Sequence, residues 1–94
     1  MKYDVSVLVP VYNVSKFIER CLHTLFGQTY TNIQYIFVDD CSPDNSVEII
    51  KQVLKEYPQR KADVKIVRHD KNRGLAAARN TGIENAEGEF ILHI

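Results

Sequence analysis

The stretch YIFVDDCSPDNS, residues 35–46, joins an apolar segment to the start of a helix and decides how the chain folds. Four β-forming residues, 35–38, stop abruptly at two adjacent acids, Asp39 and Asp40. Two neighbouring carboxylates repel each other unless water screens them or a bound group uses them. The pattern therefore predicts a buried strand that ends either at solvent or at a polar crevice.

Outward from this stretch, strand-like and helix-like segments alternate along the chain. Apolar runs rich in β-branched residues predict strands, and apolar residues at i, i+3 and i+4 spacing predict helices. The strands are expected over residues 5–11, 33–38, 64–67 and 89–94, and the helices over residues 14–26, 45–57 and 75–86. This order predicts the α/β class: a three-layer α/β/α sandwich with a mainly parallel sheet and right-handed crossovers.

Length and composition limit the function. Ninety-four residues form one domain at most, and 45% apolar with 26% charged residues is ordinary for a globular protein. Twelve basic residues balance twelve acidic ones, which argues against a nucleic-acid partner. Neither a membrane span nor a signal peptide is visible. Two cysteines, Cys21 and Cys41, are too few for a disulfide framework, so reduced thiols in the cytosol are expected.

All strands of a parallel sheet point the same way, so the segments that follow them meet at one edge. Here these segments are residues 12–13, 39–42 and 69–74. Open α/β sheets bind ligands in the crevice outside this carboxyl edge. The two acids are therefore expected where a ligand would lie.

The acids have two alternative roles. Ser42 is expected to cap the next helix, with Pro43 in its first turn, which leaves Asp39 and Asp40 without a local partner. They are then either solvated strand-end acids or ligand contacts. A carboxylate accepts hydrogen bonds, so a ribose hydroxyl or a base N–H is its natural target, whereas it repels a phosphate.

Arg79 is the candidate for an anion. It lies four residues from both Leu75 and Ile83, which places it within the expected inward stripe of the third helix. A guanidinium that faces the sheet needs a partner, so Arg79 is expected to pair with an internal carboxylate or to hold a bound anion. Loop cations at Lys71 and Arg73 are either solvated or a further anion contact.

Other residue types favour structural roles. Tyr12 offers a ring that either stacks on a base or covers the core. His23, His69 and His93 lack partners at nucleophile or metal spacing and are expected to be structural. The segment after the first strand, PVYNVSK, contains no glycine, which excludes the G-x-G-x-x-G dinucleotide motif, and the G-x-S-x-G motif of hydrolases is also absent.

Three segments carry a resemblance to a known family: VSVLVPVYNVSKFIERCLHTLFGQTY, IFVDDCSPDNSVEII and NRGLAAARNTGIENAEGEFIL. In this order they resemble the amino-terminal half of inverting family 2 glycosyltransferases with the GT-A fold. The resemblance implies that residues 1–94 form the Rossmann-like nucleotide-sugar-binding part of a longer domain, ending after the fourth strand. It implies a nucleotide-sugar donor, often a uridine diphosphate sugar.

The resemblance also implies a set of binding residues. Asp40 matches the acid that the family uses for the base, and Asp39 is its neighbour. Arg79 matches the arginine of an Ala-Arg-Asn segment near the diphosphate and the sugar. Cys41 stands where a glycine is more usual, which puts the geometry of that turn in question. The implied nucleotide-sugar-binding residues are Pro10, Val11, Tyr12, Asn13, Asp39, Asp40 and Arg79.

The resemblance places the catalytic parts elsewhere. In the family, an Asp-any-Asp motif after the fourth strand holds Mn²⁺ or Mg²⁺ on the diphosphate, and a catalytic base follows later. This chain stops at Ile94, so no catalytic or metal-binding residue is expected in it, and the chain alone is expected to be inactive. The expected acceptor is a glycan, a lipid-linked glycan or a protein, and any membrane association is left to segments outside these residues.

A second hypothesis is a non-catalytic nucleotide-binding or phospho-receiver-like module. Receiver domains also gather acids at strand ends, but their adjacent acids follow the first strand. Here the pair follows the second strand, and no Asp ends the third at the matching place. Nucleotide preference, as opposed to binding of Mg²⁺ alone, separates the two hypotheses.

Overall fold

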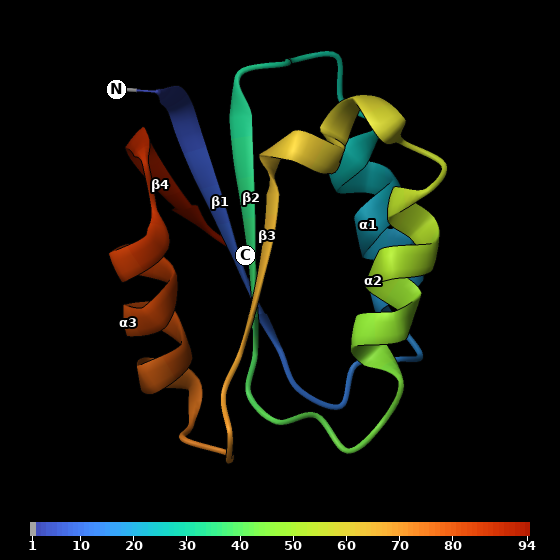
Figure 1. The fold of residues 1–94 in the computed structure, drawn as a ribbon, viewed down its shortest axis with the longest axis vertical. Helices are drawn as coiled ribbons and strands as arrows, with labels where there is room; N and C mark the ends of the chain where they lie inside the picture. The colour runs from blue at the N-terminus through green and yellow to red at the C-terminus, as the bar shows by residue number, and fades with distance from the viewer. Residues whose placement is uncertain (1) are drawn as a thin grey trace.

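The computed structural model describes residues 2–94. Its four strands form one parallel sheet in the order β3-β2-β1-β4. Figure 1 shows α1 and α2 on one face of this sheet and α3 on the other, so the predicted α/β/α layering is confirmed. The elements are β1 (Tyr3–Val11), α1 (Ile18–Phe26), β2 (Ile33–Asp39), α2 (Ser46–Leu54), the 3₁₀ helix η1 (Pro58–Asp63), β3 (Val64–Arg68), α3 (Leu75–Asn85) and β4 (Gly88–His93).

The two central strands set the position of the candidate site. Every residue of β2 is buried, as expected for a strand with a neighbour on each side and helices over both faces. In the register of β1 and β2, Val11 lies opposite Asp39, so the two strands end at the same level. The chain segments that follow β1 and β2 therefore leave the sheet side by side.

The sheet has a large core on one face and a small one on the other. On the side of α1 and α2, the ring of Phe26 makes edge contacts with Tyr35 and Phe37 within a cluster of twelve buried residues. On the side of α3, the buried cluster has four residues, with Ala78 as the helix contribution. α3 thus approaches the sheet through small side chains.

Gly82 makes this close approach possible. A Cβ atom at this position would lie 2.8 Å from Leu8 Cδ2, well inside van der Waals contact. The side chain of Leu8 therefore occupies the space that any larger residue in α3 would need. Ala78 and Gly82 together let α3 pack closely against the sheet.

The helices on one face of the sheet differ most from the expected boundaries. α1 begins at Ile18 and not at Val14, because a turn follows Asn13, whose φ of 54° interrupts the regular backbone. α2 begins at Ser46 and ends at Leu54, shorter than the expected 45–57. Pro58 starts the 3₁₀ helix η1, which the sequence pattern did not indicate. Within residues 2–94, no helix is both long enough and apolar enough to cross a membrane.

Candidate functional site

The two adjacent acids have different partners on different sides of the sheet. Successive residues of a strand face opposite ways. Phe37, two residues before Asp39, belongs to the core under α1 and α2, whereas Val38, two residues before Asp40, belongs to the core under α3. The like charges are therefore not directed at a common point.

Asp39 has a structural role. Its side chain is completely buried, and Oδ1 accepts a hydrogen bond of 3.1 Å from the backbone N–H of Ser42. Oδ2 lies 3.2 Å from Nε of Arg68, which is ion-pair distance, although the N–H is not directed at it and Oδ2 accepts no hydrogen bond. Asp39 stabilises the turn after β2 and does not line a cavity.

Asp40 is held by three hydrogen-bond donors around the start of α3. Oδ1 accepts hydrogen bonds of 2.8 Å from both Nδ1 of His69 and the backbone N–H of Arg73. Oδ2 accepts one of 2.9 Å from the backbone N–H of Gly74. Burial by itself raises the pKa of Asp40, but the hydrogen bonds from His69, Arg73 and Gly74 outweigh it, so the pKa is lowered overall. Asp40 is therefore an ionised carboxylate that holds the loop directly before α3.

The expectation that the acids lack a local partner is wrong, because Ser42 does not cap α2. Its backbone N–H binds Asp39, and its hydroxyl donates to the carbonyl oxygen of Val11 at 3.3 Å. The same hydroxyl oxygen accepts the N–H of Asn13. Ser42 thus joins the loops after β1 and β2, which fixes the floor of the candidate site.

A cavity of about 340 Å³ opens at the carboxyl edge of β1 and β2, against the start of α3. Its walls are mostly apolar, and Asp40 contributes the ionised group. Such a combination of apolar walls with few polar groups is typical of small-molecule sites. The lining residues are Pro10, Val11, Tyr12, Val14, Asp40, Asn72, Gly74, Leu75 and Ala78.

Four of the seven expected binding residues line this cavity: Pro10, Val11, Tyr12 and Asp40. Asn13, Asp39 and Arg79 do not. The structure thus brings the ends of β1 and β2 together with the loop before α3, as the parallel sheet predicted. The expectation that both acids and Arg79 open onto one crevice is wrong.

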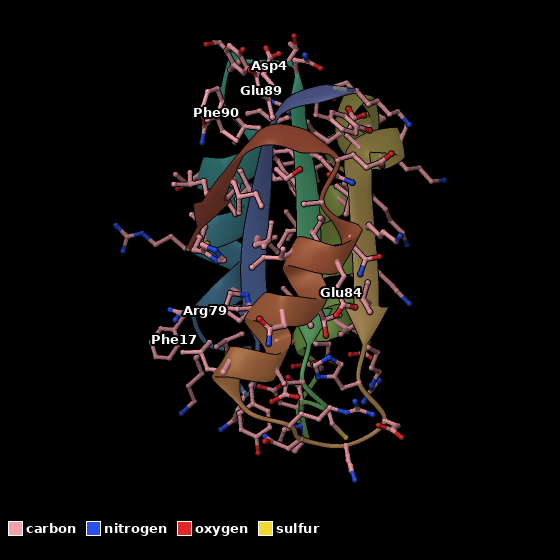
Figure 2. All side chains as sticks on the ribbon, turned by 90° about the vertical axis from the view of Figure 1, so that its left-hand side faces the viewer. Asp4, Phe17, Arg79, Glu84, Glu89 and Phe90 are labelled. Atoms are coloured by element: carbon pink, nitrogen blue, oxygen red, sulfur yellow. The ribbon has the colours of Figure 1, made fainter. Side chains whose placement is uncertain are left out.

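Arg79 does not face the sheet. It is exposed, and among residues 2–94 no carboxylate lies within ion-pair distance of it. Figure 2 shows Arg79 at the lateral edge of α3. Leu75 and Ile83, which share its face of the helix, are 53% and 46% exposed. The expected internal pair is therefore wrong, because the small residues Ala78 and Gly82 form the inward side of α3.

Sequence reasoning missed the contribution of His69. Its side chain is buried and bridges Asp40 to Thr81, whose Oγ1 lies 2.8 Å from Nε2. The two ends of the His69–Asp40 hydrogen bond are 29 residues apart in the chain, so no local motif marks it. The only available signal was the position of His69 directly after a strand whose end meets that of β2.

The turn after the two acids has the backbone conformation of a glycine at Cys41. Cys41 has a φ of 61°, in the left-handed region that glycine occupies without strain. The backbone of this turn is therefore the one that a glycine would form. A cysteine holds this conformation at the cost of local strain.

The described residues 2–94 contain no group of three or more His, Cys, Asp or Glu side chains that could hold a metal ion. The carboxylates of Asp39 and Asp40 share no partner, which also argues against a cation between them. These residues therefore do not fit the divalent cation that the resemblance implies.

Comparison with known proteins agrees with this architecture. EpsJ of Bacillus subtilis (strain 168), an uncharacterized glycosyltransferase, is 45% identical over 87 residues, which is 93% of this chain and 24% of EpsJ. The crystal structure of residues 1–349 of S. aureus TarS in complex with UDP-GlcNAc has a TM-score of 0.85 at 32% identity, over 97% of this chain and 26% of that one.

A third similar protein is the mannosyltransferase PcManGT of Pyrobaculum calidifontis in complex with GDP-Man and Mn²⁺. Its TM-score is 0.86 at 28% identity, over 97% of this chain and 26% of that one. The parallel sheet and its layers define an α/β domain of the GT-A glycosyltransferase class. The chain belongs to glycosyl transferase family 2, whose family model matches residues 6–94. It spans about a quarter of the length of these relatives.

Proposed function

We propose that this chain forms the nucleoside-binding part of a glycosyltransferase that takes its sugar from a nucleotide diphosphate donor, with a UDP-sugar as the donor. The observation that carries the proposal is the cavity at the carboxyl edge, where Asp40 meets apolar walls. Two similar structures, which are complexes with UDP-GlcNAc and with GDP-Man, also support a nucleotide-sugar donor.

Asp40 has the chemistry to recognise a base. A carboxylate oxygen offers about two acceptor positions. Among residues 2–94, Oδ2 accepts only the N–H of Gly74, so one acceptor position remains at an atom of a cavity-lining residue. A ring N–H of a base is a suitable donor for it. Tyr12, which is half exposed at the rim, offers its ring for stacking.

The diphosphate is assigned to other groups, because an ionised Asp40 repels it. Arg79 is exposed and unpaired among residues 2–94, so its guanidinium is available for the diphosphate or the sugar. The proposed reaction is a single displacement, in which an acceptor hydroxyl attacks the anomeric carbon and the nucleoside diphosphate leaves with inversion. We assign neither its general base nor its cation to residues 2–94.

Calorimetry on the full-length protein tests this function. We expect UDP to bind in preference to ADP, and Mg²⁺ alone to leave no signal. Asp40→Asn is expected to weaken UDP binding about tenfold or more, because it removes the charged acceptor. Asp70→Asn, an exposed carboxylate in the neighbouring loop, is the matched control and should leave binding unchanged.

Two results contradict the proposal. Absence of UDP and UDP-sugar binding in the wild-type protein would remove the nucleoside site. Binding of Mg²⁺ without nucleotide, lost in Asp39→Asn and Asp40→Asn, would favour the receiver-like module.

A further inference from the structure

His69 is a buried polar side chain at the site for which the proposed function has no role. It directly follows β3, and its backbone N–H donates to the carbonyl oxygen of Asp39 at 2.8 Å, which continues the sheet pairing. Its side chain is 8% exposed. Nδ1 lies 2.8 Å from Oδ1 of Asp40, and Nε2 lies 2.8 Å from Oγ1 of Thr81. One imidazole therefore connects the end of β2 with the middle of α3.

The partners of His69 determine where its protons lie. An ionised carboxylate only accepts hydrogen bonds, so Nδ1 carries the proton in the contact with Asp40. In the neutral imidazole, Nε2 is then an acceptor, and the hydroxyl of Thr81 is placed to donate to it. Thr81 thereby fixes the tautomer and the ring orientation of His69.

The hydrogen bonds of Asp40 are divided unequally between its two oxygens. Oδ1 accepts from His69 and from the N–H of Arg73, which fills its two acceptor positions. Within the described part of the chain, Oδ2 accepts only from the N–H of Gly74. The imidazole therefore helps to fill Oδ1, and Oδ2 keeps one free acceptor position.

We propose that His69, supported by Thr81, is a positioning residue that reserves Oδ2 of Asp40 for an N–H donor on the base of the bound nucleotide. The proposal rests on the proposed function and adds a basis for base selection. Uracil and guanine carry a ring N–H beside a carbonyl group, whereas cytosine presents an unprotonated ring nitrogen at the corresponding place. An oriented carboxylate accepts from the former and repels the latter.

The test measures affinities of the full-length protein for UDP and CDP. His69→Phe keeps a ring of similar shape and removes both nitrogens. We expect the affinity for UDP to fall about tenfold or more while the affinity for CDP changes little. The ratio of the two affinities therefore falls. Thr81→Val replaces the hydroxyl with a methyl group. It should lower the ratio of UDP affinity to CDP affinity in the same direction but to a smaller extent.

A control and two further variants show whether His69 acts through Asp40. Thr24→Val is the matched control, since the Thr24 hydroxyl binds the carbonyl oxygen of Arg20 on the exposed side of α1, and it should leave both affinities unchanged. In an Asp40→Asn background, His69→Phe should cause no further loss of UDP affinity. His69→Asn, whose amide can donate near the place of Nδ1, should restore part of the ratio.

A structural role for His69 gives a different result. His69→Phe would then lower the melting temperature and weaken UDP and CDP alike, and an unchanged ratio overturns the inference. If His69→Phe does not fold, an unchanged ratio in both His69→Asn and Thr81→Val overturns it. A wild-type protein that binds no UDP contradicts the proposed function itself, whereas a UDP preference that survives all three substitutions contradicts only the inference.

Discussion

At the scale of single residues, the adjacent acids after β2 are stable because they do not share an environment. Asp39 binds the turn on the side of α1 and α2, with Arg68 nearby. Asp40 binds the start of α3 and His69 on the other side. Strand alternation separates two like charges that the sequence places together, and each carboxylate has its own donors. Only one of the pair is therefore available to a ligand.

The left-handed turn at Cys41 predicts an effect on stability. Cys41→Gly should raise the free energy of unfolding by roughly 0.5–1 kcal/mol, because relief of the left-handed strain exceeds the entropy cost of glycine in the unfolded chain. Urea unfolding measures this change. Asn13→Gly is the control: its φ of 54° is similar, but asparagine tolerates this region, so the gain should be near zero. A loss of stability in Cys41→Gly contradicts the assignment of strain.

Asp44 predicts a dependence of stability on pH. A hydrogen bond from the Ser46 hydroxyl is the largest of the effects that lower the pKa of Asp44 from 3.8 to about 2; the N–H groups of Ser15 and Ser46 contribute as well. Because the folded-state pKa lies below the unfolded one, the stabilisation is present above the unfolded value and is lost as pH falls from about 4 to about 2.

Urea unfolding from pH 7 to pH 2 tests this dependence. Asp44→Asn should be less stable than wild type at pH 7, and the difference should disappear as pH approaches 2. Glu48→Gln changes an exposed acid in the first turn of α2 and is the control, expected to follow the wild-type curve. A constant difference between Asp44→Asn and wild type at every pH would show that the carboxylate charge is not responsible.

At the scale of the elements, Arg60 in η1 holds the end of α1 and the loop after it. Its side chain is buried, with Nε donating to the carbonyl oxygen of Phe26 at 3.1 Å and Nη2 to those of Gln28 and Tyr30. The guanidinium also lies over the ring of Tyr35. One side chain thus satisfies carbonyl groups that a helix end leaves without partners.

Arg60→Ala is expected to lower the free energy of unfolding by about 2–4 kcal/mol, because one buried and two partly buried carbonyl groups lose a charged donor. Chemical unfolding followed by circular dichroism measures the loss. Lys61→Ala, an exposed cation next in the same 3₁₀ helix, should change stability by less than about 0.5 kcal/mol. Equal effects of the two substitutions would mean that Arg60 acts only through its general charge.

The elements of the fold could be predicted because buried parallel strands appear as continuous apolar runs, as in residues 33–38. The start of α1 could not, since the helical spacing of apolar residues extends back to Val14 while the turn after Asn13 delays the helix. The 3₁₀ helix η1 is too short to have a period of its own. Local backbone conformation, which spacing does not report, accounts for these differences.

The location of the candidate site could be predicted, but the direction of its side chains could not. Parallel strands necessarily gather their carboxyl ends, so the loops after β1 and β2 were expected together. Arg79 is exposed because only Ala78 and Gly82 of the expected inward stripe are buried, while Leu75 and Ile83 lie at its exposed margin. The role of His69 depends on a tertiary contact and had no pattern in the sequence.

At the scale of the whole molecule, apolar side chains remain exposed along β4 and on one face of α3. Phe90 is 66% exposed and Leu92 52%. β4 pairs only with β1 among the described strands, so its outer edge has free backbone hydrogen-bonding groups. Exposed apolar edge strands promote association with other chains.

We therefore expect residues 1–94 expressed alone to associate as concentration rises, which sedimentation velocity measures. The double substitution Phe90→Lys and Leu92→Lys should shift the distribution toward monomer. Phe17→Lys is the control, because Figure 2 shows Phe17 at the opposite end of the molecule from Phe90. A monomer at all concentrations contradicts the prediction, and an equal effect of Phe17→Lys would show that β4 is not the contact.

The hydrogen bonds of Asp40 to the loop before α3 make this loop a reporter of ligand binding. The backbone N–H groups of Arg73 and Gly74 donate hydrogen bonds to the carboxylate of Asp40, a residue that lines the cavity. Any molecule that draws electron density from this carboxylate changes the magnetic environment of both amides. Occupancy of the cavity can thus be followed at two backbone positions, without a label on the ligand.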